Sequence, residues 1–177
     1  MIIGIVGAIG SGKTLFMTRC AYKEYRKNIE RIKNKEIQII TNYRLKDIPF
    51  RFIKADEMFT LKSTLTNSRI FIDEMHIFMD SRNSQSKENK ALTHFILQTR
   101  HLDTHLYFTT QDIGQVDIRL RRQLDLLVHT AKTSYEGLYK ITIYDYRDMM
   151  NITTISKIYN GANYYDMYDT KEIIDIT

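Results

Sequence analysis

Residues 7 to 14 read "GAIGSGKT" and set the architecture that we expect for the whole chain. They fit the pattern G-x-x-x-x-G-K-[ST], whose glycines let the backbone wrap a phosphate with several N–H groups pointing inward. The apolar run "IIGIV" (2–6) before the motif predicts a strand, and the helical spacing from about Lys13 to Arg26 predicts a helix after it. Because such a helix presents its positive end to an anion, this order favours a nucleotide phosphate site over a glycine-rich turn with an exposed lysine.

The motif predicts a role for each of its residues. In this pattern Lys13 reaches the β and γ phosphates of a nucleoside triphosphate, and the hydroxyl of Thr14 ligates Mg²⁺. ATP and Mg²⁺ are therefore the predicted cofactors. The residues whose backbone would cradle the phosphates are Gly7, Ala8, Ile9, Gly10, Ser11 and Gly12.

A second stretch, "RIFIDEMHIF" (69–78), places two carboxylates side by side, at Asp73 and Glu74, where an apolar strand ends. Like charges repel, and burying a carboxylate without a cation or a proton costs on the order of several kcal/mol. P-loop enzymes hold the magnesium shell with a carboxylate at the end of a second strand, which predicts that role for Asp73. Glu74 would polarise the attacking water. The alternative is that the pair only caps the next helix.

The acid pair and a further strand narrow the predicted chemistry. Many nucleoside kinases and small GTPases do not need a water-activating acid at this point, so Glu74 favours a hydrolytic motor, a Mg-dependent ATPase. The strand "THLYFTT" (104–110) ends at Gln111, whose amide can contact both the γ-phosphate and the attacking water. We therefore expect Glu74 and Gln111 to be catalytic, and Thr14 and Asp73 to hold the metal.

The distribution of strands and helices predicts an α/β fold. The two strands just described and those at 2–6 and 37–43 alternate with helical segments such as 91–100, which indicates a mainly parallel central sheet flanked by helices. After "DLLVHTAK" (125–132), the runs "GLYKITIYDYRD" and "NITTISKIY" alternate apolar and polar residues with no helix between them. They predict an antiparallel extension near the C-terminus. We expect one domain over residues 1–177.

Composition excludes several classes of protein. The 177 residues, with 43% hydrophobic and 27% charged side chains, have ordinary globular values. No apolar run approaches the roughly 20 residues needed to span a bilayer, and the single Cys20 cannot form an internal disulfide. We therefore expect a soluble intracellular protein with no stable membrane span. The net charge of +5 permits a polyanionic partner.

Several motifs together resemble a known group of proteins. In order along the chain they read "GAIGSGKT", "TNY", "IFIDEMHIFMDSR", "QTRH", "YFTTQD" and "VDIRLRRQLD". From Ile2 to about Thr130 the chain resembles the FtsK and HerA group of P-loop motor ATPases and, more narrowly, zonula-occludens-toxin-like proteins and the genome-packaging ATPases of tailless viruses. The resemblance implies a RecA-like sheet in which an extra strand separates the two nucleotide strands. It also implies a homo-oligomeric ring, a pentamer or hexamer, that translocates DNA.

The resemblance also transfers residue roles. It maps the phosphate-loop lysine and hydroxyl, the metal aspartate, the catalytic glutamate and the glutamine sensor onto Lys13, Thr14, Asp73, Glu74 and Gln111. Motors of this kind complete the site with an arginine, often from a neighbouring subunit. The candidates are Arg100 and Arg119, ranked ahead of Arg121 and Arg122.

The function that we predict is that of a viral genome-packaging ATPase, which pumps double-stranded DNA into a preformed capsid. Its expected partners are DNA and a capsid or vertex protein, and its expected location is the host cytoplasm or the virion or procapsid. A packaging motor is favoured because the sequence has no evident anchor. The alternatives are a HerA/FtsK-like cellular or plasmid translocase, a zonula-occludens-toxin-like virion assembly protein, a nucleotide-gated assembly protein that moves no DNA, and a P-loop kinase.

Two smaller clusters invite other interpretations. Tyr164, Tyr165 and Tyr168 favour docking of the C-terminal segment on the body over stacking on adenine or a DNA base. His94, His101 and His105 suggest zinc, but no cysteine or further ligand completes such a site. The loop "DSRNSQSKENK" could equally line a DNA channel or be plain surface.

Overall fold

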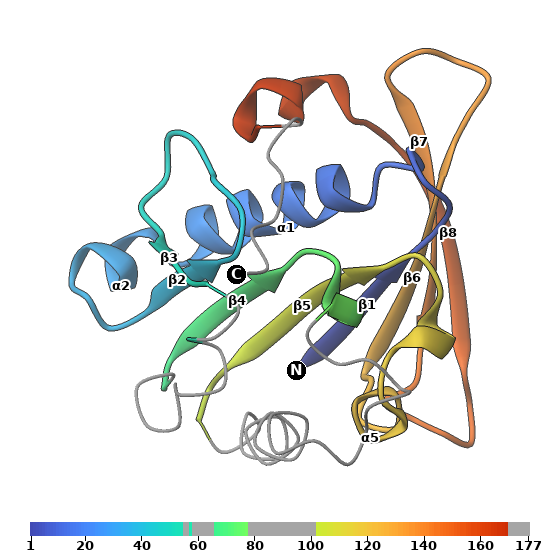
Figure 1. The fold of residues 1–177 in the computed structure, drawn as a ribbon, viewed down its shortest axis with the longest axis horizontal. Helices are drawn as coiled ribbons and strands as arrows, with labels where there is room; N and C mark the ends of the chain where they lie inside the picture. Colours follow the sequence, from blue (N-terminus) through green and yellow to red (C-terminus); the bar gives the residue numbers. More distant parts are fainter. Residues whose placement is uncertain (55–56, 58–65, 78–101, 170–177) are drawn as a thin grey trace.

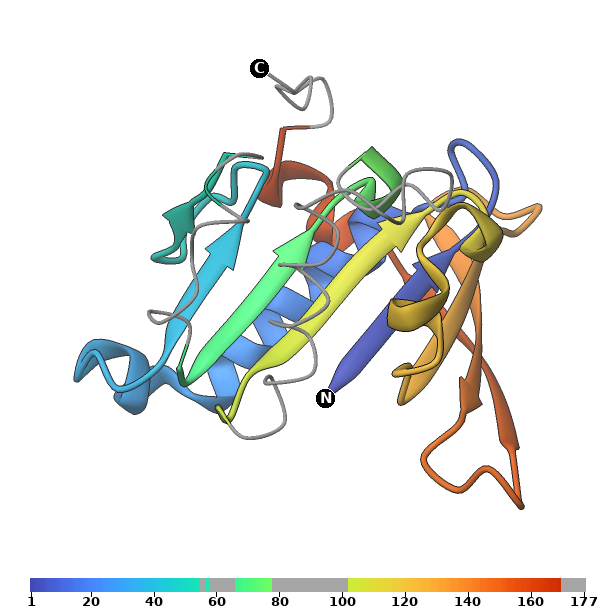
Figure 2. The same cartoon turned by 60° about the horizontal axis from the view of Figure 1, so that its bottom comes forward.

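The fold is built on one eight-stranded sheet in the order β3-β2-β4-β5-β1-β6-β7-β8. The computed structural model describes residues 1–54, 57, 66–77 and 102–169. Figure 2 displays the strand order from one edge of the sheet to the other. The strands are β1 (Ile2–Val6), β2 (Gln38–Thr41), β3 (Arg51–Phe52), β4 (Ser68–Ile72), β5 (His105–Thr110), β6 (Leu126–Lys132), β7 (Leu138–Asp145) and β8 (Thr153–Asn160).

The helices of the described residues are few and mostly short. The longest, α1, follows the phosphate loop and runs along one face of the sheet (Figure 1). The α-helices are α1 (Lys13–Lys27), α2 (Ile29–Lys33) and α5 (Ile118–Arg121), and the 3₁₀ helices are η1 (Met75–Ile77), η3 (Ile113–Gln115) and η4 (Ala162–Met167). No helix in these ranges has the length and apolar character needed to cross a membrane.

The strand pairing confirms the predicted fold class. Neighbours from β3 to β6 pair in parallel, whereas β6, β7 and β8 pair antiparallel. β5 lies between β1 and β4, which confirms that an extra strand separates the phosphate-loop strand from the strand before the paired acids. Because these three strands are parallel, the residues that follow each of them meet at one edge of the sheet.

Alternating side chains bury both faces of the sheet. On one face, Ile3 and Ile5 of β1 pack with Leu15 and Ala21 of α1. On the other face, Ile2 packs with residues of the segment that carries η3 and α5, such as Val116 and Leu120. This two-sided burial explains why β1 and the last three residues of β4 have no polar side chains, as expected for parallel strands covered on both faces.

Some boundaries differ from the sequence-based prediction. The strand predicted at 37–43 runs from Gln38 to Thr41, and the side chain of Asn42, just after it, pairs with the backbone of Asp73. A short helix, α2, follows α1, whereas the sequence predicted one helix that ends at about Arg26. The helix predicted at 91–100 and the basic loop before it lie outside the described residues.

The C-terminal segment docks on the body, as predicted. The ring of Tyr164 meets Tyr22 of α1 edge-on, and Tyr168 meets Tyr43 in the same way. Lys46 donates its backbone N–H to the carbonyl of Met167 over 3.0 Å. Figure 1 shows η4, in red, lying over the N-terminal half of α1. The last strand is thereby followed by a segment that returns to the phosphate loop.

Candidate functional site

The phosphate loop follows β1 and adopts a conformation that requires glycine. Gly10 and Gly12 have φ angles of 73° and 89°, in the left-handed region that residues with a Cβ rarely adopt. The hydroxyls of Ser11 and Thr130 lie 2.9 Å apart, and the Thr130 hydroxyl also donates to the carbonyl of Val6. The loop is therefore fixed to the end of β6 as well as to its own strand.

Lys13 and Thr14 begin α1 at the mouth of this loop. The Nζ of Lys13 donates to the carbonyl of Ala8 over 3.3 Å, so the ammonium lies across the loop while the side chain stays largely buried. The free N–H groups and the positive end of the helix dipole point to the same place. Backbone donors, a helix end and a buried lysine thus converge where an anion would bind.

Asp73 is held immediately beside this anion site. The Thr14 hydroxyl donates to both carboxylate oxygens of Asp73, at 3.0 and 3.1 Å, and the Thr109 hydroxyl donates to one of them. Asn42 binds the backbone of Asp73 twice, through its Nδ2 to the carbonyl and its Oδ1 to the N–H. Burial and, to a lesser degree, the charge of Glu74 raise the pKa of Asp73, although Thr109, Thr14 and Lys13 oppose the shift.

Glu74 occupies a strained position. Its φ of 52° is left-handed, which costs on the order of 1–3 kcal/mol for a residue other than glycine. Its N–H donates to the Thr109 hydroxyl over 2.9 Å. Its buried Oε2 lies 3.2 Å from Nδ1 of His76 but has no hydrogen bond within the described residues. The backbone is strained and a buried acceptor is left open at the residue that we predict to activate water.

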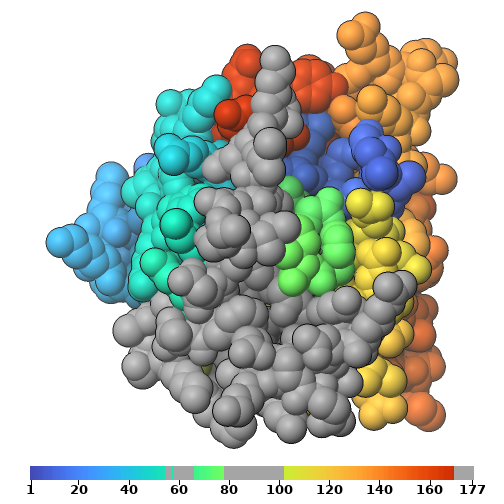
Figure 3. All heavy atoms as spheres, in the orientation of Figure 1, coloured from blue at the N-terminus to red at the C-terminus, as the bar shows by residue number. Residues whose placement is uncertain are grey.

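A cavity of about 560 Å³ brings most of the predicted residues together. Figure 3 shows the phosphate loop, in blue, at the surface between η4, in red, the β6–β7 turn, in orange, and η1, in green. Four other predicted residues, Gly7, Ala8, Ser11 and Asp73, do not line the cavity. The predicted residues that line the cavity are Ile9, Gly10, Gly12, Lys13, Thr14, Glu74 and Gln111.

Arg119, Arg121 and Arg122, three of the predicted arginines, do not line this cavity. Arg119 grips Asp117 with its Nε and Nη2, at 2.9 and 2.8 Å, in α5. This helix lies on the face of the sheet opposite α1 (Figure 2). Arg121 donates to the carbonyl of Val116. Arg100 lies outside the described residues. Among the arginines of residues 1–54, 66–77 and 102–169, none lines the cavity.

Four residues that sequence reasoning did not single out also shape the site. Asn42 and Thr109 orient the two acids, and Lys132 and Tyr139 line the cavity opposite the phosphate loop. The sequence did contain an indication for Thr109, because it lies near the end of β5, the strand between β1 and β4. Lys132 is the last residue of β6, whose position beside β1 becomes visible only in the sheet order.

The oxygen atoms at the site fit Mg²⁺. The Thr14 hydroxyl and the Asp73 carboxylate are hard oxygen ligands 3.0 Å apart at the mouth of the phosphate loop. Mg²⁺ prefers such ligands, and it is bound through one or two protein oxygens, substrate phosphates and water. In the described residues, no group of three or more His, Cys, Asp or Glu side chains forms an all-protein metal site, and His94 and His101 lie outside them.

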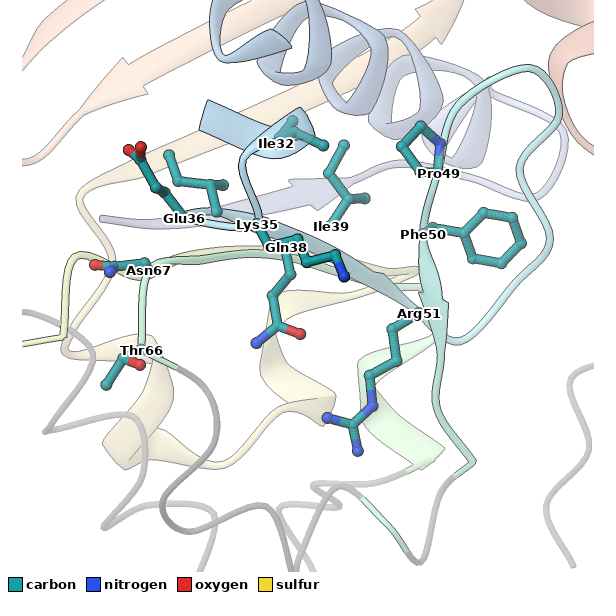
Figure 4. Close-up of a pocket in the computed structure, with 11 residues that line it drawn as sticks. Ile32, Lys35, Glu36, Gln38, Ile39, Pro49, Phe50, Arg51, Thr66 and Asn67 are labelled. Carbon is teal, nitrogen blue, oxygen red and sulfur yellow. The ribbon is translucent and has the colours of Figure 1, made fainter. Parts of the chain in front are cut away.

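A larger cavity, of about 740 Å³, lies near the other edge of the sheet (Figure 4). Its wall comes from α2, from β2 and from the segment around β3, with charged side chains such as Lys35, Glu36 and Arg51. It contains none of the residues that the sequence predicts for phosphate or metal binding. The smaller cavity is therefore the candidate site, because chemistry rather than size identifies it.

Comparisons with known proteins agree with this fold. The profile of the zonular occludens toxin (Zot) family matches residues 1–172. The structure resembles the N-terminal domain of zonular occludens toxin from Neisseria meningitidis, with a TM-score of 0.67, 23% identity, and 95% of this chain and 98% of that chain covered. No curated protein sequence matches significantly.

Two further solved structures share the fold at lower identity. The genome packaging NTPase B204 from Sulfolobus turreted icosahedral virus 2, in complex with ATP-gammaS, gives a TM-score of 0.52 at 14% identity, covering 86% of this chain and 95% of that chain. The flagellar accessory protein FlaH from Methanocaldococcus jannaschii gives 0.54 at 15% identity, covering 81% and 76%. The predicted P-loop NTPase fold and the likeness to zonula-occludens-toxin-like proteins are confirmed.

Proposed function

Since the chain belongs to the zonular occludens toxin (Zot) family, we propose that it is an ATP-hydrolysing motor that translocates double-stranded DNA and packages a viral genome into a preformed capsid. The proposal assigns residues 1–177 to one ATPase domain. The observation that carries it is the contact between Thr14 and Asp73, at 3.0 Å, which joins the phosphate loop to the strand end bearing the paired acids.

The residues suggest a division of labour during hydrolysis. Lys13 would leave the carbonyl of Ala8 and bind the terminal phosphates instead, since a phosphate is the stronger acceptor. Thr14 and Asp73 would hold Mg²⁺, which, when bound, neutralises charge on the phosphates. Glu74, which lines the cavity, would accept a proton from water through its carboxylate. Gln111 would orient the same water from the opposite side.

A complete site would need one more cation from outside the subunit. Charge that spreads over a transferring phosphoryl group is commonly stabilised by an arginine of the adjacent subunit. We propose that Arg100 or Arg119 supplies it across a ring of identical subunits. The guanidinium of Arg119 binds the carboxylate of Asp117 in its own subunit. Arg119 would therefore have to release Asp117 before it could contact a phosphate of the neighbouring subunit.

Movement of DNA is the finer part of the proposal. It is supported by the likeness to B204, which is described as a genome packaging NTPase and a DNA-packaging ATPase, and by the net charge of +5. Family membership favours a second candidate, in which the same ATPase cycle assembles virus particles rather than fills them. A requirement for duplex DNA separates the two, because an assembly protein would hydrolyse ATP equally well without it.

The decisive experiment uses Glu74→Gln, with Glu136→Gln in the exposed β6–β7 turn as the matched control. We expect Glu74→Gln to bind ATP with nearly unchanged affinity and to release phosphate at least about 100-fold more slowly. The control should behave as the wild type. Turnover of Glu74→Gln at the wild-type rate would remove the mechanism. Duplex DNA should stimulate the wild type, and the stimulation should fade with added salt.

A further inference from the structure

The candidate cavity has a second, aromatic end that the hydrolytic chemistry does not use. Beyond the phosphate loop its wall is formed by Tyr139 of β7 and by Tyr165 and Tyr168 of the C-terminal segment. The polar side chains of the same wall include Lys13, Glu74 and Gln111. A nucleotide is built in the same way, because a charged phosphate tail is joined to a flat aromatic base.

Tyr139 links the phosphate loop to the C-terminal segment. Its side chain is only 6% exposed and stacks on Tyr159 of the next strand. The edges of its ring fill the space over Gly12 and Gly161, where an added Cβ would come within 2.6 Å of ring carbons. Its position is therefore fixed by two glycines, one in the phosphate loop and one just before η4.

Tyr165 is held by Tyr139 but remains accessible. The two phenol oxygens are 3.1 Å apart, and Tyr165 is 40% exposed at the cavity wall. The adjacent Tyr168 is fixed by its edge-on contact with Tyr43 and by an antiparallel bridge to Leu45. Tyr165 thus offers an aromatic surface whose position is fixed by Tyr139 and by the neighbouring Tyr168 before any ligand binds.

The rest of η4 is anchored firmly enough to keep this position. The Tyr22 hydroxyl of α1 donates to the carbonyl of Lys46, and the backbone N–H of Lys46 donates to Met167. Since α1 also begins at the phosphate loop, one helix supports both ends of the cavity. A platform tied to the same helix as the phosphate site can recognise a ligand of fixed length.

We propose that Tyr165, positioned by Tyr139, is the platform on which the base of the bound nucleotide stacks, with a preference for purines. The inference rests on the proposed nucleotide site and adds the residue that selects the base. Stacking on an aromatic side chain is tolerant of base identity but increases with the area of the base, so ATP and GTP should bind more tightly than CTP and UTP.

The first test compares ATP with tripolyphosphate, a ligand that has the phosphates but no base. Binding of both, with Mg²⁺, is measured by calorimetry for the wild type, Tyr165→Ala and Tyr165→Phe. We expect Tyr165→Ala to weaken ATP binding about 5-fold to 100-fold and to change tripolyphosphate binding less than twofold. Tyr165→Phe keeps the ring and should stay within about threefold of the wild type for both ligands.

Tyr135→Ala is the matched control, because this tyrosine lies in the β6–β7 turn, is 72% exposed and does not line the cavity. It should bind both ligands as the wild type does. Equal weakening of ATP and tripolyphosphate by Tyr165→Ala would assign Tyr165 a merely structural role and overturn the proposal. Unchanged ATP binding by Tyr165→Ala would overturn it as well.

A fluorescent variant gives an independent readout. The chain contains no tryptophan, so Tyr165→Trp introduces a single emitter at the platform and Tyr135→Trp introduces one away from it. We expect ATP, but not tripolyphosphate, to change the emission of Tyr165→Trp, and neither ligand to change that of Tyr135→Trp. If calorimetry records ATP binding to Tyr165→Trp but its fluorescence emission does not change, stacking of the base on this residue is contradicted.

The two proposals fail in different ways. If the wild type binds neither ATP nor tripolyphosphate, the nucleotide site itself is wrong and the platform falls with it. If the wild type binds both and Tyr165→Ala retains its ATP affinity, only the platform is wrong and the proposed ATPase stands.

Discussion

Carboxylates at the two ends of the parallel strands have opposite surroundings. At the edge where the strands begin, Glu24 of α1 accepts hydrogen bonds from Arg69 at 3.1 Å and from Tyr107 at 3.0 Å. The Arg69 guanidinium also donates to the carbonyl of Asp103. At the edge where the parallel strands end, Asp73 and Glu74 lie side by side with hydroxyl donors but no salt bridge to Lys or Arg within the described residues.

The pKa shifts record this difference. Burial opposes ionisation of Glu24, but the neighbouring His105 side chain, the hydrogen bond from Tyr107 and the charge of Arg69 lower its pKa to about 2. At the other edge, burial raises the pKa of Asp73, and the Glu74 charge adds to the shift. The first cluster is complete within the chain and stabilises the fold. The second has no Lys or Arg salt bridge among the described residues, and we propose that a bound cation completes it.

The largest expected effect is on ATP hydrolysis and comes from a substitution of Asp73, at the end of the sheet where the parallel strands end. Asp73→Asn should lower the rate of ATP hydrolysis about 1000-fold, because the amide cannot supply the charge that the metal requires. The melting temperature of the nucleotide-free protein should stay unchanged or rise, since a buried charge next to Glu74 is removed. Phosphate release and calorimetric melting measure the two effects. A large fall in melting temperature would show that Asp73 is structural.

A second substitution tests the Glu24 cluster, at the end of the sheet where the strands begin. Glu24→Gln removes the nearer carboxylate partner of Arg69, which is only 4% exposed and keeps a 3.7 Å ion pair with Asp103, and should lower the free energy of unfolding by about 3 kcal/mol. Nucleotide affinity should remain within about twofold, because the cluster lies at the far edge. Denaturant titration provides the measurement. Glu30→Gln, which breaks an exposed pair with Lys33, is the control and should leave the free energy of unfolding nearly unchanged. Equal losses in both variants would contradict the comparison.

A smaller effect should appear in acid. Because folding lowers the pKa of Glu24 from 4.5 to about 2, its contribution is present above pH 4.5 and is lost as the pH falls towards 2. The free energy of unfolding of the wild type should therefore decline more steeply over this window than that of Glu24→Gln. Unfolding titrations at a series of pH values would reveal the difference. Parallel curves for the two proteins would mean that Glu24 is not the group responsible.

The sequence predicted those parts of the molecule whose signal is local. The phosphate loop, the strand before Asp73 and the alternation of β7 and β8 are each encoded in a short run, so their types and order follow from pattern alone. The roles of Thr109 and Asn42 could not be predicted in this way, because they depend on which strands become neighbours. Arg119 shows a different limit: its partner, Asp117, is two residues away, a spacing at which helix-based pairing rules predict no contact.

The C-terminal segment shows the same limit on a larger scale. Its docking was predictable from a cluster of tyrosines, whereas its place beside the phosphate loop was not. That place follows from Tyr139, which fits over Gly12 and Gly161, residues far apart in the sequence. Only the folded chain brings a glycine of the phosphate loop and a glycine before η4 against the same ring.

The proposed hydrolysis of ATP requires a divalent ion between the phosphate loop and Asp73. The affinity for a non-hydrolysable ATP analogue, measured with Mg²⁺ and with a chelator, tests this directly in the wild type and in Asp73→Asn. We predict that Mg²⁺ tightens binding at least about tenfold in the wild type and less than about twofold in the variant. Equal tightening in both proteins would show that the ion is held elsewhere and would contradict the account.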